Sequence, residues 1–170
     1  MAKIMQNQTP KSLFQITSLC AGFLGIQIGF ALQAGNVTRI LQNYGADLTE
    51  VSLFWLIAPL SGAVVQPLIG YWSDSRMNKG TSRVPFLLIG GILSVLALLA
   101  LPNANVLLQI WSPLLIGALL LVIIDISFNV SMHPLRAAIS DYLPIYQQPR
   151  GFAIQTFLIS IGSILGSILP

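Results

Sequence analysis

Five long apolar runs divide this chain, and they restrict its fold more than any other feature of the sequence. Each run reaches or approaches the roughly 20 residues that an α-helix needs to cross a bilayer. The predicted helices are 13–34, 51–72, 84–101, 106–132 and 152–169. A backbone in lipid must satisfy its own hydrogen bonds, and unbroken apolar runs argue against the alternating strands of a barrel. We therefore predict an all-α integral membrane protein with five transmembrane helices.

The composition excludes a soluble enzyme. Hydrophobic residues make up 55% of the chain and charged residues only 8%, whereas soluble domains carry about 25% charged residues. Eight Lys and Arg face five Asp and Glu, a surplus too small and dispersed for nucleic-acid binding. The chain has one Cys and one His, and it has no P-loop or nucleophile triad. We expect no enzyme activity, no metal and no cofactor.

The charges between the apolar runs predict an orientation. The N-terminus and the connections after the second and fourth predicted helices are basic, and the other connections are not. By the positive-inside rule, the N-terminus is cytoplasmic in a multi-pass protein of the plasma or inner membrane. The last run ends at Pro170 without a polar tail. We therefore expect the chain to be a fragment of a longer protein.

Asp125 points most directly to a function. It lies in the apolar run 114–130, where a carboxylate costs several kcal/mol unless it faces a partner, a cavity or a proton. Asn129 shares its helix face, and so does Arg136 if the helix continues past Pro134. Asp125 is therefore neutral, or paired with a group from another helix. A proton-coupling role and a structural hydrogen bond both stay open.

Amides interrupt the first predicted helix. Gln27 lies deep within it, and Gln33, Asn36 and Arg39 follow at helical spacing toward its outer end. Amides can bond sugar hydroxyls with fixed geometry. For Asn36 and Arg39, contacts at the membrane interface explain the pattern equally well. We predict that Gln27 and Gln33, together with Asn129, face a cavity and contact substrate.

A motif and several longer stretches resemble a known family. The connection Gly70-Tyr71-Trp72-Ser73-Asp74-Ser75-Arg76 resembles the Gly-x-x-x-Asp-x-Arg signature of the major facilitator superfamily, with Arg83 as a later base. The stretches 25–39 and 66–74 are similar to the sugar:proton symporters near the plant sucrose transporters. So is the series Asp125, Asn129, Pro134, Arg136 and Asp141. The resemblance covers nearly the whole chain, in the same order.

The resemblance implies a fold and a set of residue roles. Family members have 12 helices in two six-helix bundles, with a sugar site between them. This chain resembles five helices of the N-terminal six-helix bundle, and the C-terminal bundle is missing. Asp125 is implied as the proton-coupling group. The implied conformational latch consists of Gly70, Asp74, Arg76 and Arg83, and the implied cytoplasmic charge network consists of Arg136 and Asp141.

We therefore expect the N-terminal part of a secondary transporter. Its cargo is expected to be a sucrose- or maltose-like glucoside that travels with a proton. The expected partners are this sugar, protons, the lipid bilayer and the missing C-terminal bundle. A non-transporting membrane scaffold, or a truncated remnant of a transporter, explains the same helices and stays an alternative. The residues do not select the sugar, the direction of transport, or proton over sodium coupling.

Overall fold

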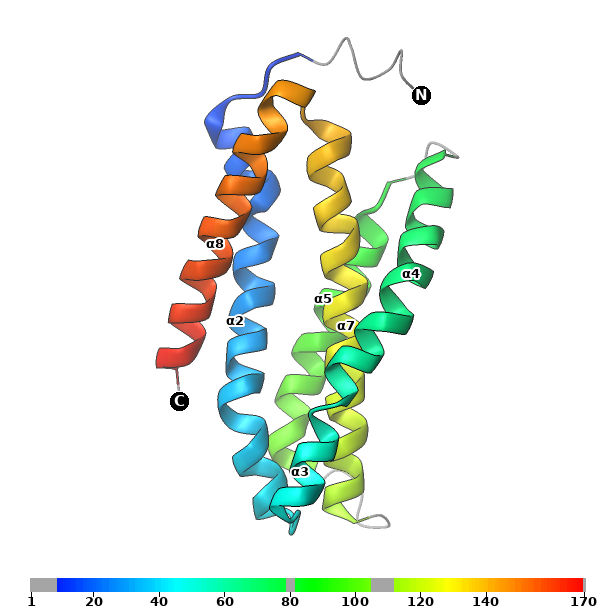
Figure 1. The fold of residues 1–170 in the computed structure, drawn as a ribbon, viewed down its shortest axis with the longest axis vertical. Helices are drawn as coiled ribbons and strands as arrows, with labels where there is room; N and C mark the ends of the chain where they lie inside the picture. Colours follow the sequence, from blue (N-terminus) through cyan, green and yellow to red (C-terminus); the bar gives the residue numbers. More distant parts are fainter. Residues whose placement is uncertain (1–8, 79–81, 105–111, 170) are drawn as a thin grey trace.

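Helices long and apolar enough to cross a membrane form five spans in the described part of the chain, and Figure 1 shows how they are arranged. The computed structural model describes residues 9–78, 82–104 and 112–169. The elements are α2 (Leu13–Asn43), α3 (Leu48–Phe54), α4 (Ile57–Asn78), α5 (Val84–Ala100), α7 (Pro113–Tyr142) and α8 (Gln148–Ile168), with the 3₁₀ helices η1 (Leu101–Asn103) and η2 (Ile145–Gln147). The described residues contain no strand, and α3 and α4 together form one of the five spans. The predicted all-α membrane fold is confirmed.

Helix α2 continues well past its predicted end at residue 34. Ser12 caps its start, where the Ser12 hydroxyl accepts a hydrogen bond from the Gln15 amide at 3.3 Å. Near the other end, the Asn36 side chain donates to the Leu32 carbonyl at 3.0 Å, so the polar residues join the helix. The chain leaves the helix just before Gly45, whose φ of 97° favours glycine. A polar stripe is thus a weaker stop signal than this glycine.

The second span is broken, although residues 51–72 predict one continuous helix. Trp55 and Leu56 lie between α3 and α4. Pro59 falls in the first turn of α4, where an amide N–H has no intrahelical acceptor and its loss costs little. Pro67, in contrast, lies inside α4. The break therefore lies just before a helical turn that can accommodate a proline.

Helix α7 runs on beyond Pro134 to Tyr142, whereas the prediction ended at residue 132. The predicted start at residue 106 lies outside the described residues, and the described helix begins at Pro113. Membrane helices tolerate an interior proline because neighbouring groups satisfy the freed carbonyl. The extension places Arg136 and Asp141 on the same helix as Asp125. The last helix, α8, begins at Gln148 instead of residue 152.

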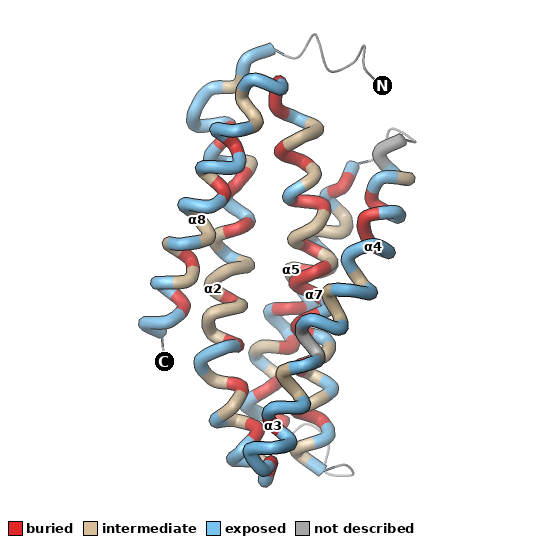
Figure 2. The backbone as a smooth tube through the Cα atoms, viewed as in Figure 1, coloured by how far each residue is buried: buried red, intermediate tan, exposed pale blue. Residues whose placement is uncertain are grey.

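Helix α7 is the centre of the packing. It contacts α2, α4 and α5, while α8 packs chiefly against α2. Figure 2 shows buried positions along α7, whereas α4 and α8 are largely exposed. Two buried apolar clusters join α2 to α7, one around Leu41, Leu121 and Phe128, the other around Cys20, Phe23 and Ile139. Because lipid is as apolar as leucine, these clusters stabilise the bundle through close packing.

Two glycines set the close contact between α8 and α2. A Cβ atom at Gly166 would lie 2.6 Å from the Ala31 Cβ and 2.7 Å from the Ile28 carbonyl oxygen. A Cβ atom at Gly162 would lie 2.7 Å from the Leu24 carbonyl oxygen. Small residues allow membrane helices to bring their backbones together in this way. The α2–α8 pair therefore depends on the absence of side chains at these two positions.

We expect Gly166→Val to separate α8 from α2 and to lower the free energy of unfolding by about 1–3 kcal/mol, the usual cost of overpacking. Gly25→Ala is the matched control, since nothing lies within 4 Å of a Cβ atom at Gly25. Unfolding of the full-length protein in detergent measures both changes. Equal destabilisation by the two substitutions would contradict the close contact.

Candidate functional site

Asp125 lies in the middle of α7 and is bonded to a neighbouring helix. Its side chain is buried, with 1% of its surface exposed. The Gln33 amide nitrogen, from α2, donates a hydrogen bond to Asp125 Oδ1 at 2.8 Å. Gln33 is itself buried. The structure therefore brings together two of the residues singled out in the sequence, and it joins α2 to α7 through them.

Asn129 and Gln66 extend this contact to α4. The Asn129 amide nitrogen donates to the Asp125 backbone carbonyl at 2.9 Å, one turn back on α7. The Gln66 amide nitrogen, from α4, donates to Asn129 Oδ1 at 2.8 Å. Gln66 was not among the predicted site residues. The available signal was a lone amide inside the apolar second span, four residues before Gly70. These four side chains, Gln33, Gln66, Asp125 and Asn129, are called the polar cluster below.

Two acceptor atoms of the polar cluster can accept a further hydrogen bond. Gln33 Oε1 and Asp125 Oδ2 are buried and have no hydrogen-bond partner among the residues that the structure describes. Buried polar atoms are normally paired, because an unmade hydrogen bond costs about 1–3 kcal/mol. A pair of acceptors of this kind is suited to a donor that binds reversibly. A proton on the Asp125 carboxyl and a hydroxyl group against Gln33 are both chemically suited to it.

Gln27 faces a different space from the polar cluster. A groove of about 910 Å³ runs between α2 and α8, and it is called the α2–α8 groove below. Gln27, Asn36 and Arg39 line it from α2, and Ser163 and Ser167 line it from α8. Gln33 instead borders a recess of about 680 Å³ toward the end of α5. The predicted substrate contacts thus divide into Gln27 at the groove and Gln33 with Asn129 in the polar cluster.

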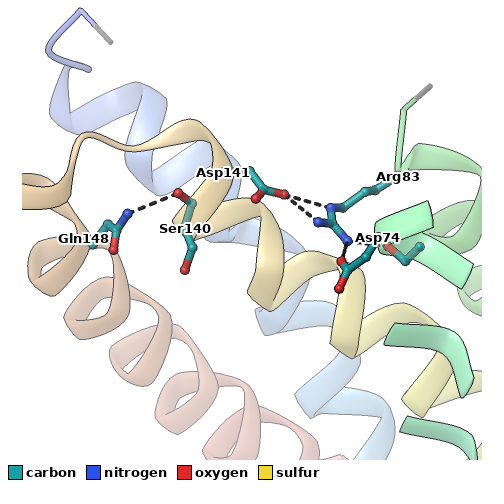
Figure 3. A network of polar contacts seen from close by, with 6 residues as sticks. Asp74, Arg83, Ser140, Asp141 and Gln148 are labelled. Carbon is teal, nitrogen blue, oxygen red and sulfur yellow. Dashed lines mark hydrogen bonds and ion pairs between the residues drawn. The ribbon is translucent and has the colours of Figure 1, made fainter. Parts of the chain in front are cut away.

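A second polar group ties α4 and α7 to the start of α5, as Figure 3 shows. Arg83 is buried at 6% exposed. Its Nη1 donates to Asp74 Oδ1 at 2.7 Å and to the Ser73 hydroxyl at 2.5 Å, and its Nε donates to Asp141 Oδ2 at 2.8 Å. Arg83 Nη2 also lies 2.8 Å from Asp141 Oδ2. This arrangement, the ion cluster, fixes three segments at the end of the molecule near the N-terminus (Figure 1).

The other latch and network residues make different contacts. The Arg76 guanidinium lies 5.9 Å from the centre of the Phe86 ring. Arg136 Nη2 lies 3.8 Å from the Met132 sulfur. Gly70 packs against the His133 ring, and a Cβ atom added at Gly70 would lie 2.8 Å from His133 Cε1. Of the predicted latch and network, the structure thus joins Asp74, Arg83 and Asp141, whereas Gly70, Arg76 and Arg136 make these separate contacts.

The described residues hold no group of three His, Cys, Asp or Glu side chains that could bind a metal ion. Carboxylate and amide chemistry is therefore what the polar cluster offers. It can hold a proton and exchange hydrogen bonds with hydroxyl groups.

Comparisons with known proteins point to one family. A model of the family described as Major Facilitator Superfamily matches residues 17–170. The sucrose transport protein SUC3 of Arabidopsis thaliana is 29% identical over 173 residues, which cover 91% of this chain and 29% of the relative. The general alpha-glucoside permease of Schizosaccharomyces pombe is 26% identical and covers 94% of this chain and 30% of the relative. The proton-associated sugar transporter A of Homo sapiens is 30% identical, and the match covers 85% of this chain and 20% of the relative.

The chain spans less than a third of the length of these relatives. Their names describe whole proteins. The polar cluster, the α2–α8 groove and the ion cluster all lie within residues 17–170, which match the family model.

Proposed function

We propose, from the premise that this chain belongs to the major facilitator superfamily, that it forms the N-terminal part of a sugar:proton symporter. The expected cargo is a glucoside such as sucrose or maltose. The names of the relatives support the cargo class, since they include a sucrose transport protein and an alpha-glucoside permease. A proton-associated sugar transporter among them supports the choice of ion. Family membership agrees with the prediction that the chain is not an enzyme.

The buried Asp125 is the observation that carries this proposal. Its Oδ2 has no partner among the described residues, and Gln33 holds its Oδ1 at 2.8 Å. An ionised carboxylate at this depth is costly, and a proton removes the charge. The protonated site can therefore close away from water, whereas the ionised site favours an open, hydrated cavity. This difference couples the proton to the alternating access that rocking bundles provide.

Gln33 offers a direct link between proton and sugar. Its nitrogen contacts the Asp125 carboxyl, and its oxygen has no partner among the described residues. A sugar hydroxyl that donates to Gln33 Oε1 therefore changes the same amide that holds the proton site. On α7, the Asn129 side chain donates to the Asp125 backbone carbonyl and accepts a hydrogen bond from Gln66. We assign Gln33 and Asn129 to sugar contact and coupling, and Gln27 to sugar contact in the α2–α8 groove.

The ion cluster is assigned to the conformational latch. Arg83 connects the end of α4 through Asp74 with the end of α7 through Asp141. Gly70 and Arg76 complete the predicted latch, and Arg136 is assigned with Asp141 to the cytoplasmic charge network. A buried guanidinium with several charged acceptors resists local movement, because each such hydrogen bond contributes about 1.5–3 kcal/mol. The cluster thus keeps α4, α5 and α7 moving as one body.

The distribution of charge supports the proposed orientation. Described basic residues at the end near the N-terminus include Lys11, Arg76, Arg83 and Arg150, whereas Asp47 and Glu50 lie at the opposite end. By the positive-inside rule, the end with the ion cluster faces the cytoplasm. The α2–α8 groove then lies toward the outer half of the membrane, because Arg39 lines it.

Uptake by the full-length reading frame tests the proposal. Cells that express it should take up labelled sucrose or maltose in a saturable way, faster with an inward proton gradient and slowly with a protonophore. Cells with the empty vector supply the background. No uptake of either sugar by a protein that reaches the membrane would contradict the proposed function.

We expect Gln27→Ala to raise the KM for sugar up to about tenfold, since one hydrogen bond contributes about 0.5–1.5 kcal/mol. The maximal rate should change little, because Gln27 does not contact Asp125. Gln42→Ala on the exposed side of α2 is the control, and it should leave KM unchanged. Initial rates over a range of sugar concentrations measure both. An unchanged KM in the Gln27 variant would remove this residue from the sugar site.

A further inference from the structure

A line of polar side chains follows the contact between α4 and α7. The Asn129 side chain donates to the Asp125 backbone carbonyl and accepts from Gln66, and the ion cluster lies farther along the same two helices. His133 lies on this line, one helical turn beyond Asn129. It is the single histidine of the sequence, and the transport cycle described above makes no use of it. An ionisable side chain inside a membrane span is a candidate for a function.

The imidazole ring of His133 is held against α4 and has an open ring nitrogen. A Cβ atom at Gly70 would lie 2.8 Å from His133 Cε1 and 3.1 Å from Nε2, so the ring rests on bare glycine backbone. His133 Nδ1 is buried and has no hydrogen-bond partner in the described part of the chain. A histidine that only fills space normally has its ring nitrogens paired. Nδ1 is therefore available to a proton or to a donor.

A small polar cavity adjoins the ring. Its volume is about 10 Å³, and its lining consists of Gln66, Asn129, Met132, His133 and Arg136. One water molecule needs roughly 10–15 Å³ and at least two polar partners. The two amides and the imidazole are suitable partners. A space the size of one water thus connects His133 with the amides of the polar cluster.

The spacing places His133 midway between the two acidic groups of α7. Positions 125, 133 and 141 are evenly separated, by about 12 Å each at 1.5 Å per residue. This separation is too long for a direct hydrogen bond between side chains. A proton therefore needs water to cross it, and the small cavity can hold about one water molecule beside His133. His133 divides one long path into two shorter ones.

We propose that His133 is a second proton-carrying side chain, which accepts the proton that Asp125 releases and passes it to water at the end with the ion cluster. This inference rests on the proposed proton symport. In the step, the O–H bond of the neutral Asp125 carboxyl breaks, water carries the proton, and an N–H bond forms on the imidazole. The products are the Asp125 carboxylate and the His133 imidazolium. Release of that proton to water restores the neutral imidazole.

The charges on α7 suit a short-lived cation at His133. Arg136 lines the same cavity, and its positive charge opposes a lasting imidazolium. The Asp125 carboxylate, two turns away, attracts the imidazolium while the proton is on its way. Imidazole is also the side chain that most readily changes its charge in the physiological pH range.

The neighbouring helices add few charges at this level. From α4, Asp74 lies one turn beyond the contact with His133, and its carboxylate is paired with Arg83. In sequence, α2 carries one charged residue, Arg39, near its opposite end, and α5 carries none between Val84 and Ala100. Arg76 of α4 stacks near Phe86. The proton balance at His133 thus depends mainly on Asp125 and Arg136.

His133→Gln in the full-length protein tests the inference, since it keeps a polar side chain and removes the titrating group. Sugar exchange at equal concentrations and equal pH needs no net proton release, so it should stay within about twofold of wild type. Proton-driven sugar accumulation should fall by about tenfold or more, in keeping with the loss of a proton-transfer group. Sugar accumulation should also depend less steeply on the pH at the cytoplasmic side. Gln42→Ala, at an exposed position of α2, is the control and should keep wild-type accumulation and pH dependence.

His133→Asn is assayed in parallel, together with the amount of each variant in the membrane, so that a folding defect in one variant does not decide the result. Wild-type accumulation and pH dependence in either properly inserted variant would overturn the inference. An equal loss of exchange and accumulation would also overturn it, because that pattern indicates a packing role. A wild-type protein that moves no protons with sugar would contradict the proposed function itself.

Discussion

Asp125→Asn abolishes proton-driven sugar accumulation and leaves sugar counterflow in place, if Asp125 binds the coupling proton. Asparagine keeps the size of the side chain and offers Gln33 an oxygen at the same position, but it cannot gain or lose a proton. The cavity can then still close around sugar, but the proton gradient cannot drive transport because the side chain at position 125 does not bind the proton. Membrane vesicles that contain the full-length protein allow both measurements on one preparation.

The expected size of this effect follows from the driving force. One pH unit corresponds to about 1.36 kcal/mol, so a gradient of about 2 units supports roughly 100-fold accumulation with one proton per sugar. The Asn variant should level off near equal sugar concentrations inside and outside. Asp47→Asn is the matched control, because Asn caps a helix as well as Asp does and position 47 is exposed. Full accumulation by the Asp125 variant would remove it as the coupling group.

Arg83→Ala has the second large expected effect, on stability and on the latch. The substitution leaves Asp74 and Asp141 near each other without their shared cation. Breaking a buried pair costs about 3–5 kcal/mol. Asp74 is 59% exposed and Asp141 28% exposed, and water compensates part of the loss. We therefore expect the free energy of unfolding to fall by about 2–3 kcal/mol.

Arg76→Ala provides a close comparison for Arg83→Ala. Both positions border the same connection, and both substitutions remove one positive charge. Arg76 has an exposed position near the Phe86 ring, a contact that contributes about 0.5–1 kcal/mol. Denaturation of the full-length protein in detergent separates the two cases. Similar losses for both variants would show that net charge matters more than the ion cluster.

The spans and the family could be predicted because their signals are local. Long apolar runs have a single stable form in lipid, and the Gly70-to-Arg76 motif is contiguous. Helix ends were predicted less well. The prediction ended two helices at residues 34 and 132, whereas the described helices end at Asn43 and Tyr142, and it missed the break at Trp55–Leu56. A membrane helix includes polar residues and proline whenever neighbouring helices compensate them.

The partners of the site residues could not be predicted from one helix at a time. Spacing on α7 identified Asp125 and Asn129 as neighbours, and the structure adds Gln33 and Gln66 from two other helices. Likewise, the resemblance named Arg83 as a latch residue, and the structure adds its pairing with Asp74 and Asp141. The side-chain contacts between helices depend on their rotation and depth, which helical periodicity does not contain.

Simultaneous measurement of sugar and proton fluxes tests the central claim most directly. The purified full-length protein in liposomes, with a pH-sensitive dye inside and no starting pH gradient, receives sucrose or maltose from outside. The proposed symport predicts that sugar entry acidifies the interior at a fixed ratio of protons to sugar, and that Asp125→Asn removes the acidification. Sugar entry at the wild-type rate without any movement of protons would contradict it.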